Sequence, residues 1–101
     1  MIKYAEILRL ANILMRKRIP FYIHGLFGGW QICYPTYDLD GRVCSVIEHD
    51  GSYGRENDRL EIMGLLTPDE QDMDSVLGYL TADEVAERIE KHYTANKSLY
   101  C

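Results

Sequence analysis

The stretch that decides the fold is FYIHGLFGGWQICY, residues 21–34. Its residue types predict one strand over residues 21–26 and a second over residues 30–34. The Gly28-Gly29 pair between them is typical of a tight turn, and so short a connection makes the two strands antiparallel neighbours. A phosphate-binding loop is the competing interpretation of these glycines. That loop requires a helix after the glycines, whereas residues 30–34 continue as a strand.

The strand pattern continues along the chain. Residues 42–49 predict a third strand and residues 59–63 a fourth, joined by a longer loop that begins at Asp50-Gly51. Residues 75–80 are extended in character and can add a fifth strand at the edge. We therefore predict an α+β fold whose sheet is an antiparallel β-meander of four to five strands, most of it within about residues 20–64.

Both faces of this sheet are expected to be partly covered. In the third strand Val43 and Ile47 point to one face while Cys44 and Val46 point to the other, so neither face is wholly polar. The eight tyrosines can cover the second face, because a phenol buries a large apolar body and keeps its hydroxyl in water.

An N-terminal helix is predicted over residues 2–17 and is expected to pack on the sheet. Its basic end, Arg16-Lys17-Arg18, suits the negative end of the helix dipole, and Pro20 marks the stop. A phosphate-binding patch is the alternative interpretation of the basic end. Apolar residues recur every three or four positions along one helix face: Tyr4, Ile7, Leu8, Ala11, Leu14 and Met15.

Two capping boxes predict helices in the second half. Thr67 to Glu70 starts a short helix over residues 68–73, and Thr81 to Glu84 starts a final helix over residues 82–93, followed by a tail over residues 95–101. The final helix is also expected to pack on the sheet, with its buried face formed by Ala82, Val85, Ala86, Ile89 and Tyr93. A solvated outer face is expected from the ion pairs Glu84 with Arg88 and Glu87 with Lys91.

Composition indicates a single domain spanning residues 1–101. The chain is 47% hydrophobic and 27% charged, with 11 Lys and Arg against 16 Asp and Glu, a net charge of −5. This balance is typical of a globular protein, and no apolar run reaches the roughly 20 residues of a membrane span. We expect a cytoplasmic protein, because the N-terminus has no signal-peptide pattern.

The charge is unevenly distributed. Residues 1–47 carry a balance of +3 and residues 48–90 a balance of −10. Such an acidic second half argues against nucleic acid as a partner and favours a basic protein surface, although plain solubility explains the same carboxylates.

No cofactor or metal is expected. The three cysteines have no CxxC spacing, and the three histidines have no ligand spacing with each other or with the cysteines. Cys33 and Cys44 lie in predicted strands, where a free thiol behaves as a small hydrophobe, and Cys101 is expected to expose its thiol.

A candidate binding surface lies where the first and third strand connections meet, at one end of the meander. No catalytic residue is assigned, because strand-end and turn chemistry explains the same residues. The surface would gather aromatic, titratable and charged side chains on loops of a rigid scaffold: Phe27, Trp30, His49, Asp50, Tyr53 and Arg55.

The chain resembles small uncharacterised proteins carried by phages and conjugative elements of Gram-positive gut bacteria. The resemblance spans about residues 20–93 and implies a bacterial cytosolic accessory protein without an assigned activity. It rests on GWQI at 29–32, VCSVIEH at 43–49, SYG at 52–54, LEIMGLL at 60–66 and VLGYLTADEV at 76–85.

Three functional hypotheses follow. The first is a non-enzymatic domain that binds another protein through its tyrosine-rich and acidic surfaces. The alternative is a small enzyme or ligand-binding domain, with His49 as an acid or base and with Tyr53 and Arg55 orienting an anionic substrate. The third is a homodimer formed by edge-strand pairing, because the predicted fourth or fifth strand can be left at a sheet edge.

Overall fold

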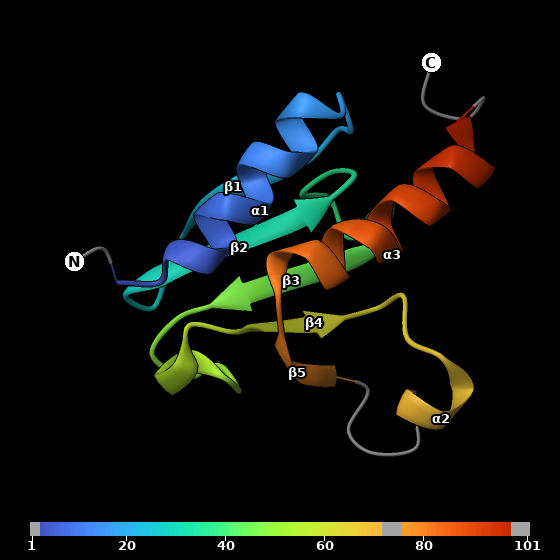
Figure 1. Ribbon diagram of the computed structural model, residues 1–101. Coiled ribbons are helices and arrows are strands. Elements are labelled where there is room, and N and C mark those ends of the chain that lie inside the picture. Colours follow the sequence, from blue (N-terminus) through green and yellow to red (C-terminus); the bar gives the residue numbers. More distant parts are fainter. Residues whose placement is uncertain (1–2, 72–75, 98–101) are drawn as a thin grey trace.

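The computed structural model describes residues 3–71 and 76–97, and shows two long helices and a five-stranded sheet (Figure 1). The strands lie in sequence order, β1-β2-β3-β4-β5, and each pairs antiparallel with the next. This confirms the predicted α+β meander, with residues 76–80 as its fifth, edge strand. The elements in chain order are α1 (Ala5–Arg16), β1 (Tyr22–Leu26), β2 (Gly29–Tyr34), β3 (Cys44–Glu48), β4 (Leu60–Met63), α2 (Pro68–Gln71), β5 (Val76–Leu80) and α3 (Ala82–Ala95).

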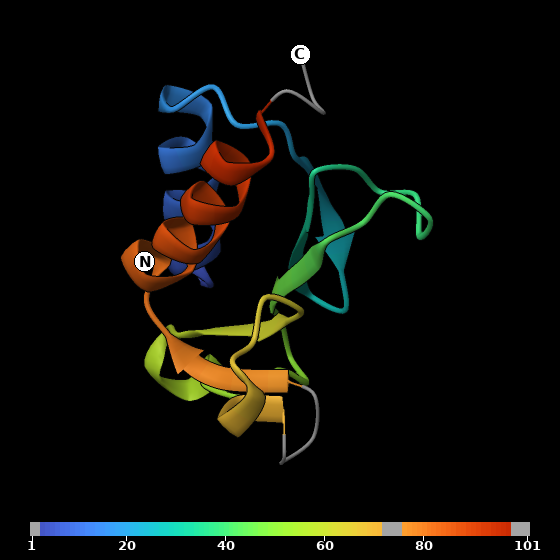
Figure 2. The same ribbon diagram turned by 90° about the vertical axis from the view of Figure 1, so that its right-hand side faces the viewer.

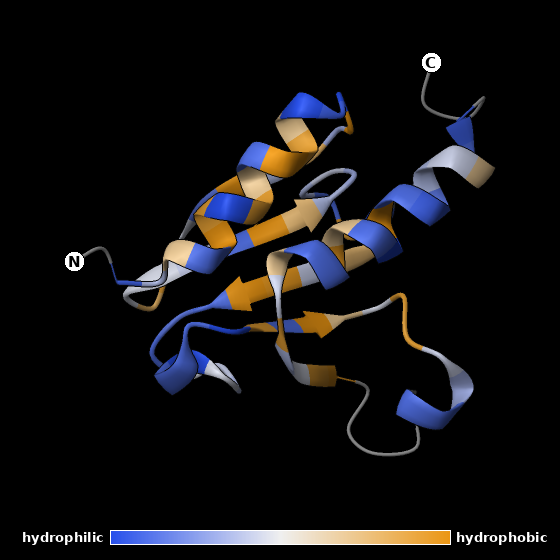
Figure 3. Ribbon diagram, viewed as in Figure 1, coloured by the Kyte–Doolittle hydropathy of each residue, from blue (hydrophilic) through white to orange (hydrophobic). Residues whose placement is uncertain are grey.

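Helices α1 and α3 pack against each other and on the same face of the sheet (Figure 2). Figure 3 shows hydrophobic residues along β2 and β3. Along α1, hydrophobic residues alternate with hydrophilic ones. The core lies between these layers, where Ile32 and Val46 meet residues such as Leu10 and Ile89. We call the opposite sheet face the open face, because it carries neither α1 nor α3.

The buried stripe of α1 differs at two positions from the prediction. Leu10 is fully buried although it was not predicted, whereas Met15, predicted on the apolar face, is 63% exposed. Leu10 lies three residues after Ile7 and four before Leu14, so all three side chains fall on one helix face. Met15 follows Leu14 directly and is therefore rotated about 100° out of that stripe.

The β1–β2 hairpin turns one residue earlier than the glycine pair suggested. Phe27 and Gly28 form the turn with φ of 46° and 82°, the left-handed conformation of a type I′ hairpin. Gly29 already belongs to β2. A side chain there is excluded by close packing, since its Cβ would lie 2.0 Å from the Glu48 carbonyl oxygen.

Helix α3 begins and ends close to the predicted positions. Thr81 accepts from the Glu84 amide and the Glu84 carboxylate accepts from the Thr81 amide, which confirms the capping box. The helix continues to Ala95, so the predicted tail begins later than residue 95. The remaining tail, residues 98–101 with Cys101, and the predicted helix end at residues 72–73 lie outside the described residues.

Arg88 is not on a solvated helix face, contrary to the prediction. Its guanidinium forms two hydrogen bonds to the Glu70 carboxylate, at 2.8 and 2.7 Å, and a third to the Leu65 carbonyl at 2.9 Å. Both side chains are about three-quarters buried, with 24% and 22% exposed. The guanidinium lowers the pKa of Glu70 to about 2. The pair therefore fastens α2 to α3 and is not part of an i,i+4 ladder along α3.

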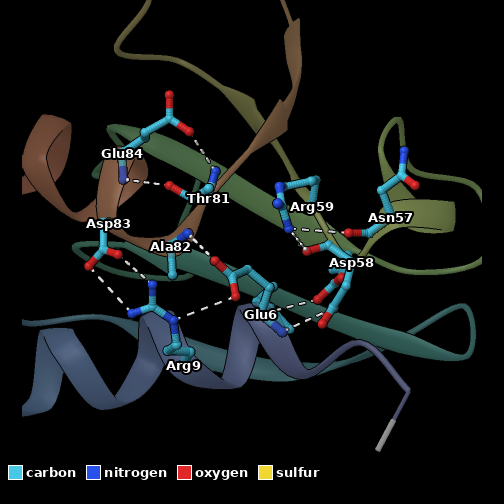
Figure 4. Close-up of polar contacts among 11 residues, drawn as sticks. Glu6, Arg9, Asn57, Asp58, Arg59, Thr81, Ala82, Asp83 and Glu84 are labelled. Carbon is cyan, nitrogen blue, oxygen red and sulfur yellow. Dashed lines mark hydrogen bonds and ion pairs between the residues drawn. The ribbon is translucent and has the colours of Figure 1, made fainter.

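The N-termini of α1 and α3 meet at the side chain of Glu6 (Figure 4). Its carboxylate accepts from the Ala82 amide at 2.6 Å and lies 3.6 Å from Arg9 Nε. Arg9 also binds Asp83, at the start of α3. These contacts fix how the two helices lie on the sheet. Within residues 3–71 and 76–97, no helix has both the length and the apolar character needed to cross a membrane.

Candidate functional site

Part of the predicted loop-end surface does come together. The rings of Phe27 and His49 meet edge to face with centroids 5.4 Å apart. The Asp50 amide donates to the Phe27 carbonyl at 3.1 Å. The first and third strand connections therefore lie at the same end of the sheet, as the meander predicts.

Asp50 has a structural role at this end. Its carboxylate accepts from the Tyr4 hydroxyl at 2.5 Å and from Lys3 Nζ at 3.2 Å. The Tyr4 hydroxyl, followed by Lys3, lowers the pKa of Asp50. The residue thus ties the β3–β4 loop to the start of α1.

His49 is nearly buried and is engaged in its own turn. Its Nδ1 atom accepts from the Gly51 amide at 3.0 Å, and its backbone amide donates to Ser52 Oγ at 3.1 Å. Because Nδ1 accepts a hydrogen bond, the neutral ring carries its proton on Nε2. The local turn thus accounts for the side chain without a substrate.

The three residues of the enzymatic alternative have different surroundings. Arg55 lines a hollow of about 800 Å³ together with the start of α1, including Lys3 and Tyr4, and with Asp58. His49 and Tyr53 do not line this hollow. Tyr53 lies against β5, where a Cβ on Gly78 would be 2.5 Å from the Tyr53 Cβ.

Trp30 lies within β2, two residues after the hairpin turn. It lies opposite Gly25 of β1 on one side and Glu48 of β3 on the other. The residue is 37% exposed. Its half-exposed indole therefore lies near the edge strand of the sheet.

The sequence analysis did not identify Glu48, whose pKa is strongly shifted, at the hairpin end of the sheet. The side chain is fully buried, and its Oε1 atom accepts from the Ile7 amide at 3.0 Å. Burial, reinforced by a hydrogen bond to Asp58, raises the pKa of Glu48 to about 8. The period-2 pattern contains the signal, because Glu48 follows Cys44 and Val46 on the core face of β3.

Glu48 and Asp58 form a carboxylic acid–carboxylate pair that caps α1. The hydrogen bond from Glu48 lowers the pKa of Asp58, so Glu48 carries the proton and Asp58 the charge. Asp58 Oδ1 accepts from the Glu6 amide at 3.1 Å. Both acids thereby satisfy amides of the first helical turn, and a negative charge at a helix N-terminus is favourable. Glu48 has no exposed surface with which to contact a substrate. We therefore assign the pair a structural role at the start of α1.

The open face carries a further surface, outside the predicted loop-end residues. Strand register places one row of residues directly across it, since residues opposite each other in antiparallel strands share a face. That row is Tyr22, Cys33, Ser45 and Met63.

Aromatic rings from the β2–β3 loop and β1 cluster over this row. The Tyr37 ring lies 5.3 Å from the Tyr22 ring and 5.4 Å, edge to face, from the His24 ring. The Arg42 guanidinium lies 5.3 Å from the Tyr37 ring and donates to the Tyr37 carbonyl. We call Tyr22, His24, Tyr37 and Arg42 the aromatic cluster. Its two tyrosines are 48% and 50% exposed, so the cluster is both ordered by mutual contacts and accessible.

Hydrogen bonds link three polar side chains of the open face, from β1 through β2 to β3. His24 Nε2 lies 2.6 Å from Gln31 Oε1, and Gln31 Nε2 donates to Ser45 Oγ at 2.7 Å. Hydrogen-bonded side chains of this kind have few alternative rotamers. The open face is thus a preorganised surface.

The cysteines in the strands are buried, as predicted. Cys33 is fully covered, and burial raises the pKa of its thiol. Burial also raises the pKa of Cys44 to about 12. A thiolate is the nucleophilic form, so neither thiol suits catalysis near neutral pH.

No family model, no curated protein and no solved structure matches this chain. Among the described residues, no group of three or more His, Cys, Asp or Glu side chains is placed to hold a metal ion.

Proposed function

We propose that this protein is a non-enzymatic protein-interaction domain that binds its partner through the open face, with the aromatic cluster at the centre. The observation that carries the proposal is the arrangement of the two long helices. Both α1 and α3 pack on one face, while the opposite face presents half-exposed tyrosines held in place by an arginine and a histidine.

The composition of this surface supports a protein partner. Tyrosine, methionine and arginine are enriched in the cores of protein interfaces, and the open face brings together Tyr22, Tyr37, Arg42 and Met63. Tyrosine also loses little conformational entropy on binding, because its ring has only two torsions. Ordering the rings before binding lowers this cost further.

The net charge of −5 favours a protein over a nucleic acid partner. Tyrosines on an open sheet can also stack with bases, so nucleic acid is the competing occupant of the same face. An accessory role in a phage or conjugative element, implied by the sequence resemblance, suits a small domain that blocks or recruits another protein.

Capture from a bacterial lysate with paired variants tests the proposal. The double variant Tyr22→Ala/Tyr37→Ala should lose a stoichiometric protein partner that the wild-type protein retains, because two central aromatic contacts are removed. Phe27→Ala is the matched control, since Phe27 is an exposed aromatic residue at the hairpin end. It should retain the partner. Circular dichroism of each variant confirms that the fold is intact.

Three outcomes would overturn the proposal. Loss of the partner in Phe27→Ala but not in the double variant would assign binding to the loop end. Equal retention by every variant would remove the open face from binding. Binding of single-stranded oligonucleotides that depends on Tyr22 and Tyr37, without any protein partner, would assign the face to nucleic acid.

A further inference from the structure

We propose that two copies of this chain pair through β1, edge to edge and antiparallel, to form one continuous sheet. This inference concerns the backbone edge of the sheet, although β1 also contributes Tyr22 and His24 to the aromatic cluster. β1 is the first strand in the sheet order, and none of its five residues is buried. An edge strand with unpaired backbone groups is a template for another strand.

The hairpin geometry shows which backbone groups of β1 face outward. The two-residue turn pairs Leu26 with Gly29, and in such a hairpin this closing pair exchanges hydrogen bonds. Hydrogen-bonded and non-bonded pairs alternate along antiparallel strands. His24 and Tyr22 therefore bond to β2, while the amide and carbonyl groups of Ile23 and Gly25 point away from the sheet. In the monomer the exposed Gly25 carbonyl oxygen lies 3.0 Å from His24 Nδ1, a contact that pairing would share or replace.

A second copy fits this edge in one symmetric register. Full pairing of Tyr22–Leu26 with itself places the two-fold axis at His24. Ile23 then pairs with Gly25 of the second copy, twice, which gives four backbone hydrogen bonds. A large side chain faces glycine in both pairs. Gly25 has room for such a neighbour, since a Cβ built on it would have only the Gly29 carbonyl oxygen nearby, at 3.8 Å.

Charge favours the same arrangement. β1 contains no Lys, Arg, Asp or Glu, so pairing brings no like charges together. Antiparallel pairing sets the segment before β1, with exposed Arg18, beside the hairpin end of the second copy. The Asp50 carboxylate lies at that end, against Gly28. Within the described residues, Arg18 makes no ion pair in the monomer, so it is available to this acid.

The opposite edge of the sheet is built differently. The β4–β5 register shifts between Leu60 and Ile62, and Tyr79 of β5 has a φ of 63°. Tyr53 also packs on Gly78 in the middle of β5. Such irregular edges resist pairing with another chain. β1 is therefore the edge of this sheet that suits a second copy.

Disulfide crosslinking tests the register directly. In a Cys101→Ser background, His24→Cys should form a covalent dimer under mild oxidation, because the residue faces its own copy across the axis at a Cα separation of about 4.5 Å. Met63→Cys is the control. It lies on the same open face and is 56% exposed, but on β4. Equal crosslinking of both variants would overturn the proposal.

Sedimentation across a concentration series tests the hydrogen bonds. Gly25→Pro removes an outward amide that is not used inside the monomer, and should weaken dimerisation at least about tenfold. Gly25→Ala keeps that amide and should dimerise like the wild-type protein. Arg18→Glu, at an exposed site, should weaken the dimer in low salt. A strictly monomeric wild-type protein, or a dimer unchanged by both Gly25→Pro and Arg18→Glu, would overturn the proposal.

Discussion

The two long helices begin in opposite ways. Helix α3 is capped locally, by Thr81 and Glu84 three residues apart. Helix α1 begins at Tyr4, which provides no side-chain cap. Its first amides instead donate to Glu48 and Asp58, which lie 41 and 52 residues further along the chain than the amides they bind. A local cap forms with the helix itself, whereas a distant cap forms only with the whole fold. The start of α1 therefore depends on the sheet, and the start of α3 far less so.

The largest expected effect comes from removing the distant cap. Glu48→Ala leaves the Ile7 amide without its acceptor and opens a cavity beneath α1, so it should lower the free energy of unfolding by about 3 kcal/mol. Urea denaturation measures this loss. Glu48→Gln is the control, because its amide oxygen can still accept from Ile7 and its amino group can donate to Asp58. A loss as large in Glu48→Gln would show that the hydrogen bonds to Ile7 and Asp58 are not the source of the stabilisation.

The distant cap should also make stability depend on pH. The folded state raises the pKa of Glu48 from 4.5 to about 8 and so holds the proton more tightly than the unfolded chain. This stabilisation is complete below pH 4.5 and is lost as the pH rises towards 8. Relative to Glu48→Gln, the wild-type protein should lose about 3.5 kcal/mol between pH 5 and pH 8.

Unfolding curves at several pH values measure this difference. The lowered pKa of Asp58 acts in the opposite sense, but only below its ordinary value of 3.8, and so outside this range. Glu87→Gln, on the exposed side of α3, should leave the pH profile of the wild-type protein unchanged. Parallel profiles for the wild-type protein and Glu48→Gln would refute a protonated Glu48.

Glu6 links the two helix starts and should have an intermediate effect. Glu6→Ala removes the acceptor of the buried Ala82 amide, and this should cost about 1.5 kcal/mol. The loss should appear in thermal unfolding as a lower midpoint. An unchanged midpoint would mean that the capping box alone satisfies the start of α3.

The smallest effect is expected at the local cap. Thr81→Ala should cost about 1 kcal/mol, the usual contribution of a threonine N-cap. Thr81→Ser, which keeps the hydroxyl, should recover most of it in the same urea experiment. If Thr81→Ala cost more than Glu48→Ala, the contrast between the two helices would be reversed.

The same contrast explains what could be predicted from the sequence. The strands and the capped helix α3 follow from residues close together in the chain, and the structure confirms them, with the first hairpin turn shifted by one residue. The roles of Arg88 and Glu48 could not be predicted, because folding alone brings them close to their partners. Those partners are Glu70 for Arg88 and the Ile7 amide for Glu48. The candidate surface was predicted at the loop end from sequence spacing. Tyrosines were predicted to cover the second face of the sheet, but not which ones, because Tyr37 reaches Tyr22 only after the β2–β3 loop has folded over the sheet.

The distant cap of α1 also bears on the order in which the chain acquires structure during synthesis. Helix α1 is translated before every strand of the sheet, yet the acids that satisfy its first amides are translated 41 and 52 residues later. The Ala82 amide that binds Glu6 follows after 76 residues. Helix α1 is therefore made before the sheet, yet it is among the last parts of this fold to become fixed.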